Sequence, residues 1–139
     1  MNWLVDKLHN FFWEVRRRLW NMKHGQPRVN GVDLYVDDTR TCYLKGYYHA
    51  KTAEEAWDIL SSQTVVNASF DHDLGDSKRW TGYDLVLCLA RYKEEFGLNY
   101  WPKNKPVIHS ANPVGCVNME SVIERYGPYT RTNHLRSVK

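Results

Sequence analysis

The chain has 139 residues, of which 42% are hydrophobic, 19 are basic and 16 are acidic, so it is long enough for one domain with a buried core. Its net charge of +3 is too small to indicate a nucleic-acid-binding surface by itself, and no apolar run reaches the roughly 18 residues of a membrane span. The first residues lack the basic and apolar regions of a signal peptide, and three scattered cysteines argue against a disulfide framework, so we expect a cytoplasmic protein.

Residues 3–23 predict an amphipathic helix, which Gly25 and Pro27 would end, so we treat 1–27 as a segment of its own. Its apolar positions recur at helical spacing at Leu4, Leu8, Phe11, Val15 and Leu19. Three interpretations stay open. The helix packs on its own domain, forms the seam of a homodimer, or lies on a membrane surface.

Four predicted strands alternate with three predicted helices along the rest of the chain. The strands are expected at 32–36, 46–50, 65–70 and 106–110. The first helix follows Thr52, which forms the pattern of a capping box with Glu55. The second helix covers 83–96 and stops at Gly97, and the third runs through Tyr126. The basic tail, 128–139, is weakly patterned and is expected to be extended.

Strands that alternate with helices are typical of a parallel sheet joined by right-handed crossovers. We therefore expect residues 28–127 to form a three-layer, flavodoxin-like α/β domain with a four-stranded parallel sheet in the order 2-1-3-4. The first and third strands are then neighbours, and such folds bind ligands at the carboxyl edge of the sheet. This order brings Asp37 and Asp38 next to Asp71, with His109 and Ser110 beside them.

The polar residues at these strand ends suit phosphorus chemistry. Opening a cyclic phosphodiester needs one group that takes a proton and another that gives one, and imidazoles suit both tasks because their unperturbed pKa lies near neutrality. We expect His72 and His109 to form this pair, and leave open which is the base. Asp71 or Asp73 would hold one imidazole in its working tautomer.

Other polar and aromatic residues near the strand ends are candidates for substrate binding. Ser110 and Asn112 can donate hydrogen bonds to phosphate oxygens, next to helix amides that favour anions. Arg40 and Arg79, in the adjacent loops, can offset negative charge, and Trp80 can stack on an unpaired base.

A second scheme uses a metal ion. Asp37, Asp38 and Asp71 can hold Mg²⁺ or another divalent cation, because Mg²⁺ prefers carboxylate oxygen. The metal would neutralise phosphate charge and activate water. Without a cation or basic groups, three convergent carboxylates would repel an anionic substrate, so the imidazole and metal schemes both stay open.

The order of these motifs resembles the receiver domain of two-component signalling over roughly residues 32–126. An acidic pair, Asp37-Asp38, ends the first strand, Asp71 ends the third, and Ser110-Ala111 ends the fourth. The resemblance implies a flavodoxin-like fold. Two features depart from it. The sequence predicts no first crossover helix, and the tail offers no fifth strand with the Lys-Pro pair whose lysine grips a phosphoryl group.

The strings FDHDLG (70–75) and IHSANP (108–113) together are similar to a divergent branch of that fold, the cyclic-phosphate-processing receiver-like domains. This resemblance implies action on a cyclic phosphate at an RNA end, or on ADP-ribose cyclic phosphate. It implies the site residues Asp37, Asp38, Asp71, His72, Asp73, His109 and Ser110.

Three functions are therefore compared. The favoured one is a phosphoesterase that opens a cyclic phosphate on a nucleotide-like small molecule or an RNA terminus. The second is a signalling receiver in which Asp71 accepts a phosphoryl group. The third is a module that sequesters a cyclic nucleotide and returns it unchanged.

Overall fold

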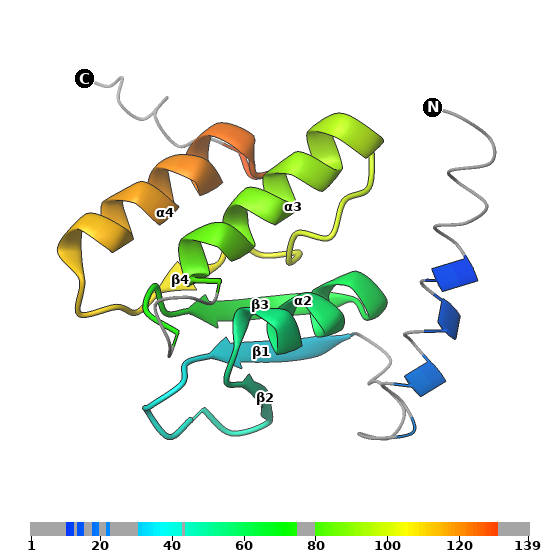
Figure 1. Ribbon diagram of the computed structural model, residues 1–139, viewed down its shortest axis with the longest axis horizontal. Helices are drawn as coiled ribbons and strands as arrows, with labels where there is room; N and C mark the ends of the chain where they lie inside the picture. Colours follow the sequence, from blue (N-terminus) through cyan, green and yellow to red (C-terminus); the bar gives the residue numbers. More distant parts are fainter. Residues whose placement is uncertain are drawn as a thin grey trace.

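The computed structural model describes residues 11–12, 14–15, 18–19, 22, 31–42, 44–74 and 80–130. A parallel four-stranded sheet with the strand order β2-β1-β3-β4 forms its centre (Figure 1), which confirms the predicted topology. The strands are β1 (Val32–Val36), β2 (Tyr47–Ala50), β3 (Val65–Phe70) and β4 (Val107–Ile108).

The strand β4 is shorter than the predicted 106–110. Only Val107 and Ile108 pair with β3, opposite Ser69 and Phe70. His109 still donates its backbone N–H to the carbonyl of Phe70, at 2.9 Å. Its backbone is therefore held at the end of the sheet although it lies just beyond the strand.

Three helices follow the strands, α2 (Ala53–Ser62), α3 (Gly82–Phe96) and α4 (Pro113–Tyr126). The Thr52 side chain accepts a hydrogen bond from the backbone N–H of Glu55, which is the N-cap half of the predicted capping box. Gly97 ends α3 with a φ of 69°, a left-handed conformation that glycine adopts without strain.

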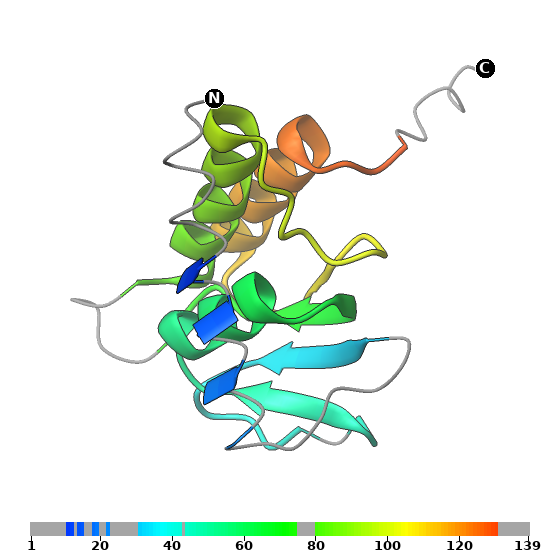
Figure 2. The ribbon, with the colours of Figure 1, turned by 90° about the vertical axis from the view of Figure 1, so that its right-hand side faces the viewer.

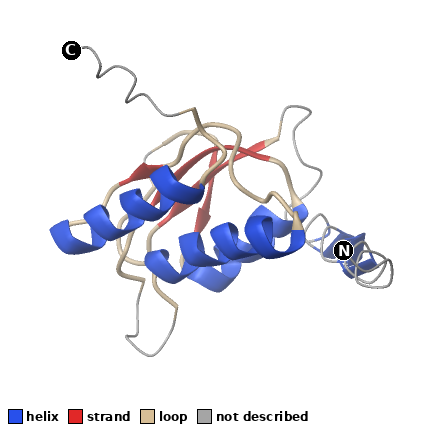
Figure 3. Cartoon of the chain, turned by 90° about the horizontal axis from the view of Figure 1, so that it is seen from above, coloured by secondary structure: helices blue, strands red, loops and turns tan. Residues whose placement is uncertain are grey.

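The helices α2, α3 and α4 lie on the same face of the sheet (Figure 3), and α3 and α4 lie side by side (Figure 2). Right-handed crossovers explain this, because the chain moves in one direction from β2 through β3 to β4. The second helix layer of a three-layer arrangement is not among the residues that the structure describes.

The core lies between the sheet and these helices. Leu34 of β1, Phe70 of β3, Leu85 of α3 and Met119 of α4 are completely buried. Because successive strand side chains alternate between faces, Tyr35 and Ser69 lie on the opposite face of the sheet from these residues. The two faces of the sheet therefore carry different side chains, and side chains from both faces lie near its carboxyl edge.

Tyr92 and Phe96 lie in the second half of α3. Both are only half-buried. The Tyr92 ring packs edge-on against Trp57 and Phe96 at centroid distances of 4.8 and 5.4 Å. These aromatic rings shield one another near the C-terminal end of α3, but neither Tyr92 nor Phe96 is fully buried.

Most of the predicted N-terminal helix and of the basic tail lies outside the residues that the structure describes. Seven described residues between 11 and 22 are helical, and of these Phe11, Phe12 and Leu19 are exposed. The rest of the predicted helix, Leu4 and Leu8 included, and residues 131–139 lie outside the described residues, so packing or dimerisation by this segment stays a prediction. Among the residues that the structure describes, no helix is long and apolar enough to cross a membrane.

Candidate active site

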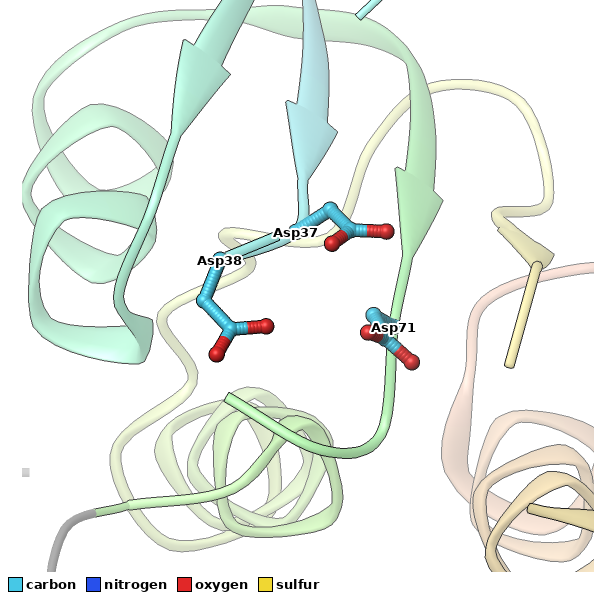
Figure 4. Close-up of side chains that lie close together, drawn as sticks. All are labelled: Asp37, Asp38 and Asp71. Atoms are coloured by element: carbon cyan, nitrogen blue, oxygen red, sulfur yellow. The ribbon is translucent and has the colours of Figure 1, made fainter. Parts of the chain in front are cut away.

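Three carboxylates meet at the carboxyl edge of the sheet, as the strand order predicted. Asp37 and Asp38 follow β1, and Asp71 follows β3. Backbone bonds of 2.9 Å from Asp71 N–H to the Val36 carbonyl and of 3.1 Å from Asp37 N–H to the Ala50 carbonyl hold the strand ends together. One carboxylate oxygen of each aspartate lies within 4.8 Å of the other two, around a common space (Figure 4).

The Asp37 carboxylate is fully buried and saturated with hydrogen bonds. Its Oδ1 accepts the backbone N–H groups of Thr39 and Arg40, both at 2.9 Å. Its Oδ2 lies 3.0 Å from Nε2 of His109 and 3.8 Å from the Arg40 guanidinium. Burial acts to raise the pKa of Asp37, but the donors from Arg40, Thr39 and His109 outweigh it and lower the pKa below its ordinary value. Asp37 is therefore a stable anion.

The Asp71 carboxylate is in a less favourable position. Burial raises its pKa, and the negative charge of Asp37 raises it further, against the lowering effect of a hydrogen bond from the Ser110 hydroxyl. The net pKa lies above the ordinary value for an aspartate. This repulsion between neighbouring carboxylates is the kind that a bound cation relieves.

The three carboxylates suit a magnesium ion. One oxygen each of Asp37, Asp38 and Asp71 lies within 4.8 Å of the other two, and carboxylate oxygens are the ligands that Mg²⁺ prefers, so these three residues would hold the ion. Asp38 is half-buried, which leaves one side of the cluster open to solvent.

His109 is enclosed on several sides. Its Nε2 bonds to Asp37, and its Nδ1 lies 2.6 Å from the Ser69 hydroxyl. Its ring stacks on Tyr35 with a centroid distance of 4.6 Å and an interplanar angle of 4°. The Arg40 guanidinium donates to the His109 carbonyl at 2.8 Å. We had expected Asp71 or Asp73 to hold one of the imidazoles, and Asp37 was not foreseen in this role.

His72 lies against the first turn of α4. Its Nδ1 is 2.8 Å from Oδ1 of Asp73, the pairing that the sequence predicted. A Cβ atom at Gly115 would be 2.5 Å from Cγ of His72, so the ring can occupy this place only because residue 115 has no side chain. The His72 carbonyl accepts the backbone N–H of Gly82 at 2.8 Å, which fixes the backbone of the residue as well.

The predicted substrate-binding residues have different surroundings. The Ser110 hydroxyl accepts the backbone N–H of Asn112 at 3.1 Å, and the Asn112 side chain caps α4 by accepting from Gly115 N–H at 2.9 Å. Both residues therefore shape the β4–α4 loop. Trp80 is 42% exposed just before α3. Arg79 lies outside the described residues.

Several residues near the site were missed. His49, which showed no partner pattern in the sequence, has its Nε2 2.6 Å from the Asp37 carbonyl. Its position follows from the parallel register, which pairs it with Tyr35. Ser69 and Gly115 were also not singled out, although Ser69 is the second-last residue of the predicted strand 65–70 and pairs with the fourth strand.

The comparisons with known proteins agree with this geometry. The family model of the cyclic-phosphate processing receiver domain matches residues 32–125, which is more than half of the chain. No curated protein and no solved structure gives a match. The match covers all four strands and ends within α4. The chain therefore belongs to the family of cyclic-phosphate processing receiver domains.

Proposed function

We propose that this receiver-like domain hydrolyses a cyclic phosphate on a nucleotide-like ligand. The observation that carries the proposal is the meeting of three carboxylates, with oxygens within 4.8 Å of one another, beside a histidine that is paired with Asp73. Both groups stand at the carboxyl edge, where open α/β sheets bind ligands. The description of the family names cyclic-phosphate processing, which supports the class of substrate.

The proposed reaction is the ring opening of a phosphodiester by water. An imidazole takes a proton from the water, whose oxygen bonds to phosphorus while the bond from phosphorus to one ribose oxygen breaks. The freed ribose oxygen takes a proton, and the product is a phosphomonoester. When bound, a divalent cation at Asp37, Asp38 and Asp71 would neutralise the added negative charge of the phosphate.

Two residues are proposed to bind the rest of the substrate. The Arg40 guanidinium is about half exposed and uses only Nη1 in the bonds described above, so its other nitrogens can meet a phosphate. The exposed Trp80 ring can stack on a base. Each candidate substrate carries both a phosphate and a base. The candidates are a nucleotide 2′,3′-cyclic phosphate, an RNA terminus of the same chemistry and ADP-ribose cyclic phosphate.

The test is to incubate the full-length protein with 2′,3′-cyclic nucleotides and ADP-ribose 1″,2″-cyclic phosphate, with Mg²⁺ or with EDTA, and to separate the products. We expect ring opening that falls strongly in His72→Ala, in His109→Ala and in Asp71→Asn. Glu94→Gln, on the exposed side of α3, serves as the control and should keep wild-type turnover. Turnover that survives EDTA would favour a scheme without metal.

The two rival functions give different results in the same samples. A sequestering module would release the cyclic ligand intact after denaturation of the complex. A signalling receiver would leave the cyclic substrates unchanged, and would respond to an acyl-phosphate mimic and Mg²⁺ with a spectral shift that vanishes in Asp71→Asn. Either pattern would replace our proposal.

A further inference from the structure

The two imidazoles of the site lie on different faces of the sheet. His109 stacks on Tyr35 and bonds to Ser69, the side chains that point away from α2, α3 and α4. His72 lies on the helical side, against Gly115 of α4. We propose that they have different roles, which rests on the proposed function: His72 is the one catalytic imidazole, and His109 is a positioning residue that holds Asp37.

The hydrogen-bond partners assign the tautomer of each neutral ring. A carboxylate oxygen only accepts, so a ring nitrogen bonded to it must carry the proton. His72 is bonded to Asp73 through Nδ1, which places its proton there and leaves Nε2 bare. His109 is bonded to Asp37 through Nε2, which places its proton on Nε2 and leaves Nδ1 bare. The two histidines therefore have opposite tautomers.

His109 has no nitrogen left for a substrate. Its Nε2 proton is donated to Asp37, and its Nδ1 accepts the proton of the Ser69 hydroxyl, 2.6 Å away. The stacked Tyr35 ring covers one side of the imidazole. To act as a base, His109 would have to give up one of these bonds. Its present contacts instead orient the Asp37 carboxylate toward the space shared with Asp38 and Asp71.

His72 has the free nitrogen that a base needs. Within the residues that the structure describes, its Nε2 has no hydrogen-bond partner. The atoms closest to the Cβ position of Gly115 are Cγ, Cδ2 and Nδ1 of the ring, with Cγ the nearest, so α4 supports the ring around Cγ. Asp73 and Gly115 thus fix the ring from two directions and leave its basic atom unobstructed.

The chemical step then has one protein base. Nε2 of His72 takes a proton from water, the water oxygen bonds to phosphorus, and the bond from phosphorus to one ribose oxygen breaks. That ribose oxygen takes a proton from solvent water, and the His72 imidazolium returns its proton to solvent. One water is consumed, and the base is regenerated.

The first test measures the tautomers and needs no substrate. A long-range ¹H–¹⁵N correlation spectrum of the ¹⁵N-labelled full-length protein distinguishes protonated from bare ring nitrogens, and is assigned with the His72→Gln and His109→Gln variants. We expect a protonated Nδ1 and a bare Nε2 in His72, and the reverse in His109. A protonated Nε2 in His72, or a bare Nε2 in His109, would overturn the inference.

The second test uses glutamine, which can donate a hydrogen bond but cannot act as a base. With 2′,3′-cyclic AMP as the probe, His72→Gln should lower kcat by about 10²- to 10⁴-fold with little change in KM. His109→Gln can still donate to Asp37 and should restore most of the turnover that His109→Ala loses, about 10- to 100-fold for a group that supports a ligand.

The outcomes separate this inference from the proposed function. If His109→Gln loses as much turnover as His72→Gln, both imidazoles take part in the chemistry and the inference is wrong, although the function stands. If the wild-type protein opens none of the cyclic phosphates, the proposed function fails. The tautomers can still be measured in that case, and they decide the roles of the two rings independently.

Discussion

Replacing Asp71 with asparagine should stabilise the metal-free protein, although it removes a residue of the site. Two unit charges 4.8 Å apart repel each other by about 3 kcal/mol at an effective dielectric constant of about 20. Arg40 and the hydrogen bonds to Asp37 offset part of this repulsion. We therefore expect a gain of about 1 kcal/mol, or about 4 °C in Tm for a domain of this size.

The matched variant, Asp37→Asn, should have the opposite effect. Asp37 is a buried anion with donors on both oxygens, and an asparagine amide cannot accept from all of them. Hydrogen bonds to charged groups contribute about 2 kcal/mol in such places, so Tm should fall by about 8 °C. Thermal and urea unfolding of both variants in EDTA at neutral pH measure the pair. An Asp71→Asn protein that is less stable than wild type would refute the assumed repulsion.

The pH dependence of stability gives a second test of the effect of Asp71→Asn. Because its pKa is raised, the folded protein holds this proton more tightly than the unfolded chain does. The wild-type protein should lose stability as the pH rises from the unfolded pKa of about 4 through the raised pKa. Asparagine does not titrate, so the advantage of Asp71→Asn should be small below this range and complete above it.

Three further variants probe the site. Gly115→Ala places a methyl group 2.5 Å from Cγ of His72 and should lower kcat on 2′,3′-cyclic AMP by at least about 10-fold. An unchanged kcat would mean that the position of the His72 ring does not affect turnover. Asp38→Asn should weaken Mn²⁺ binding, measured by calorimetry, by about 10-fold, and equal affinities would remove Asp38 from the metal site. Trp80→Ala should raise KM about 10-fold for a cyclic nucleotide but not for ribose 2,3-cyclic phosphate, which has no base. Equal effects on both substrates would exclude base stacking.

The sheet and its acidic edge were predictable because they depend on patterns along the chain. Apolar runs marked the strands, and alternation with helices set their parallel order. Asp37 and Asp71 directly follow two of these runs, so their meeting required only that β1 and β3 be neighbours. The His72–Asp73 pair was also visible, since the two residues are adjacent.

The partners of His109 were not predictable in the same way. Its bond to Asp37 joins residues 72 positions apart, and it depends on the rotamers of both side chains. The contact between His49 and the Asp37 carbonyl depends on the register between β1 and β2. Because no helix is predicted between these two strands, the sequence does not reveal that register. Gly115 looked like an ordinary residue of a helix start, because its importance lies in the ring that fills the space above it.

The most direct test of the account is a ³¹P NMR spectrum of 2′,3′-cyclic AMP after incubation with the protein and Mg²⁺ in ¹⁸O-labelled water. Hydrolysis at the carboxyl edge predicts that the cyclic resonance is replaced by a phosphomonoester carrying one ¹⁸O, and that His72→Gln slows this conversion at least about 100-fold. A cyclic resonance that persists with the wild-type protein, or a monoester without the label, would contradict it.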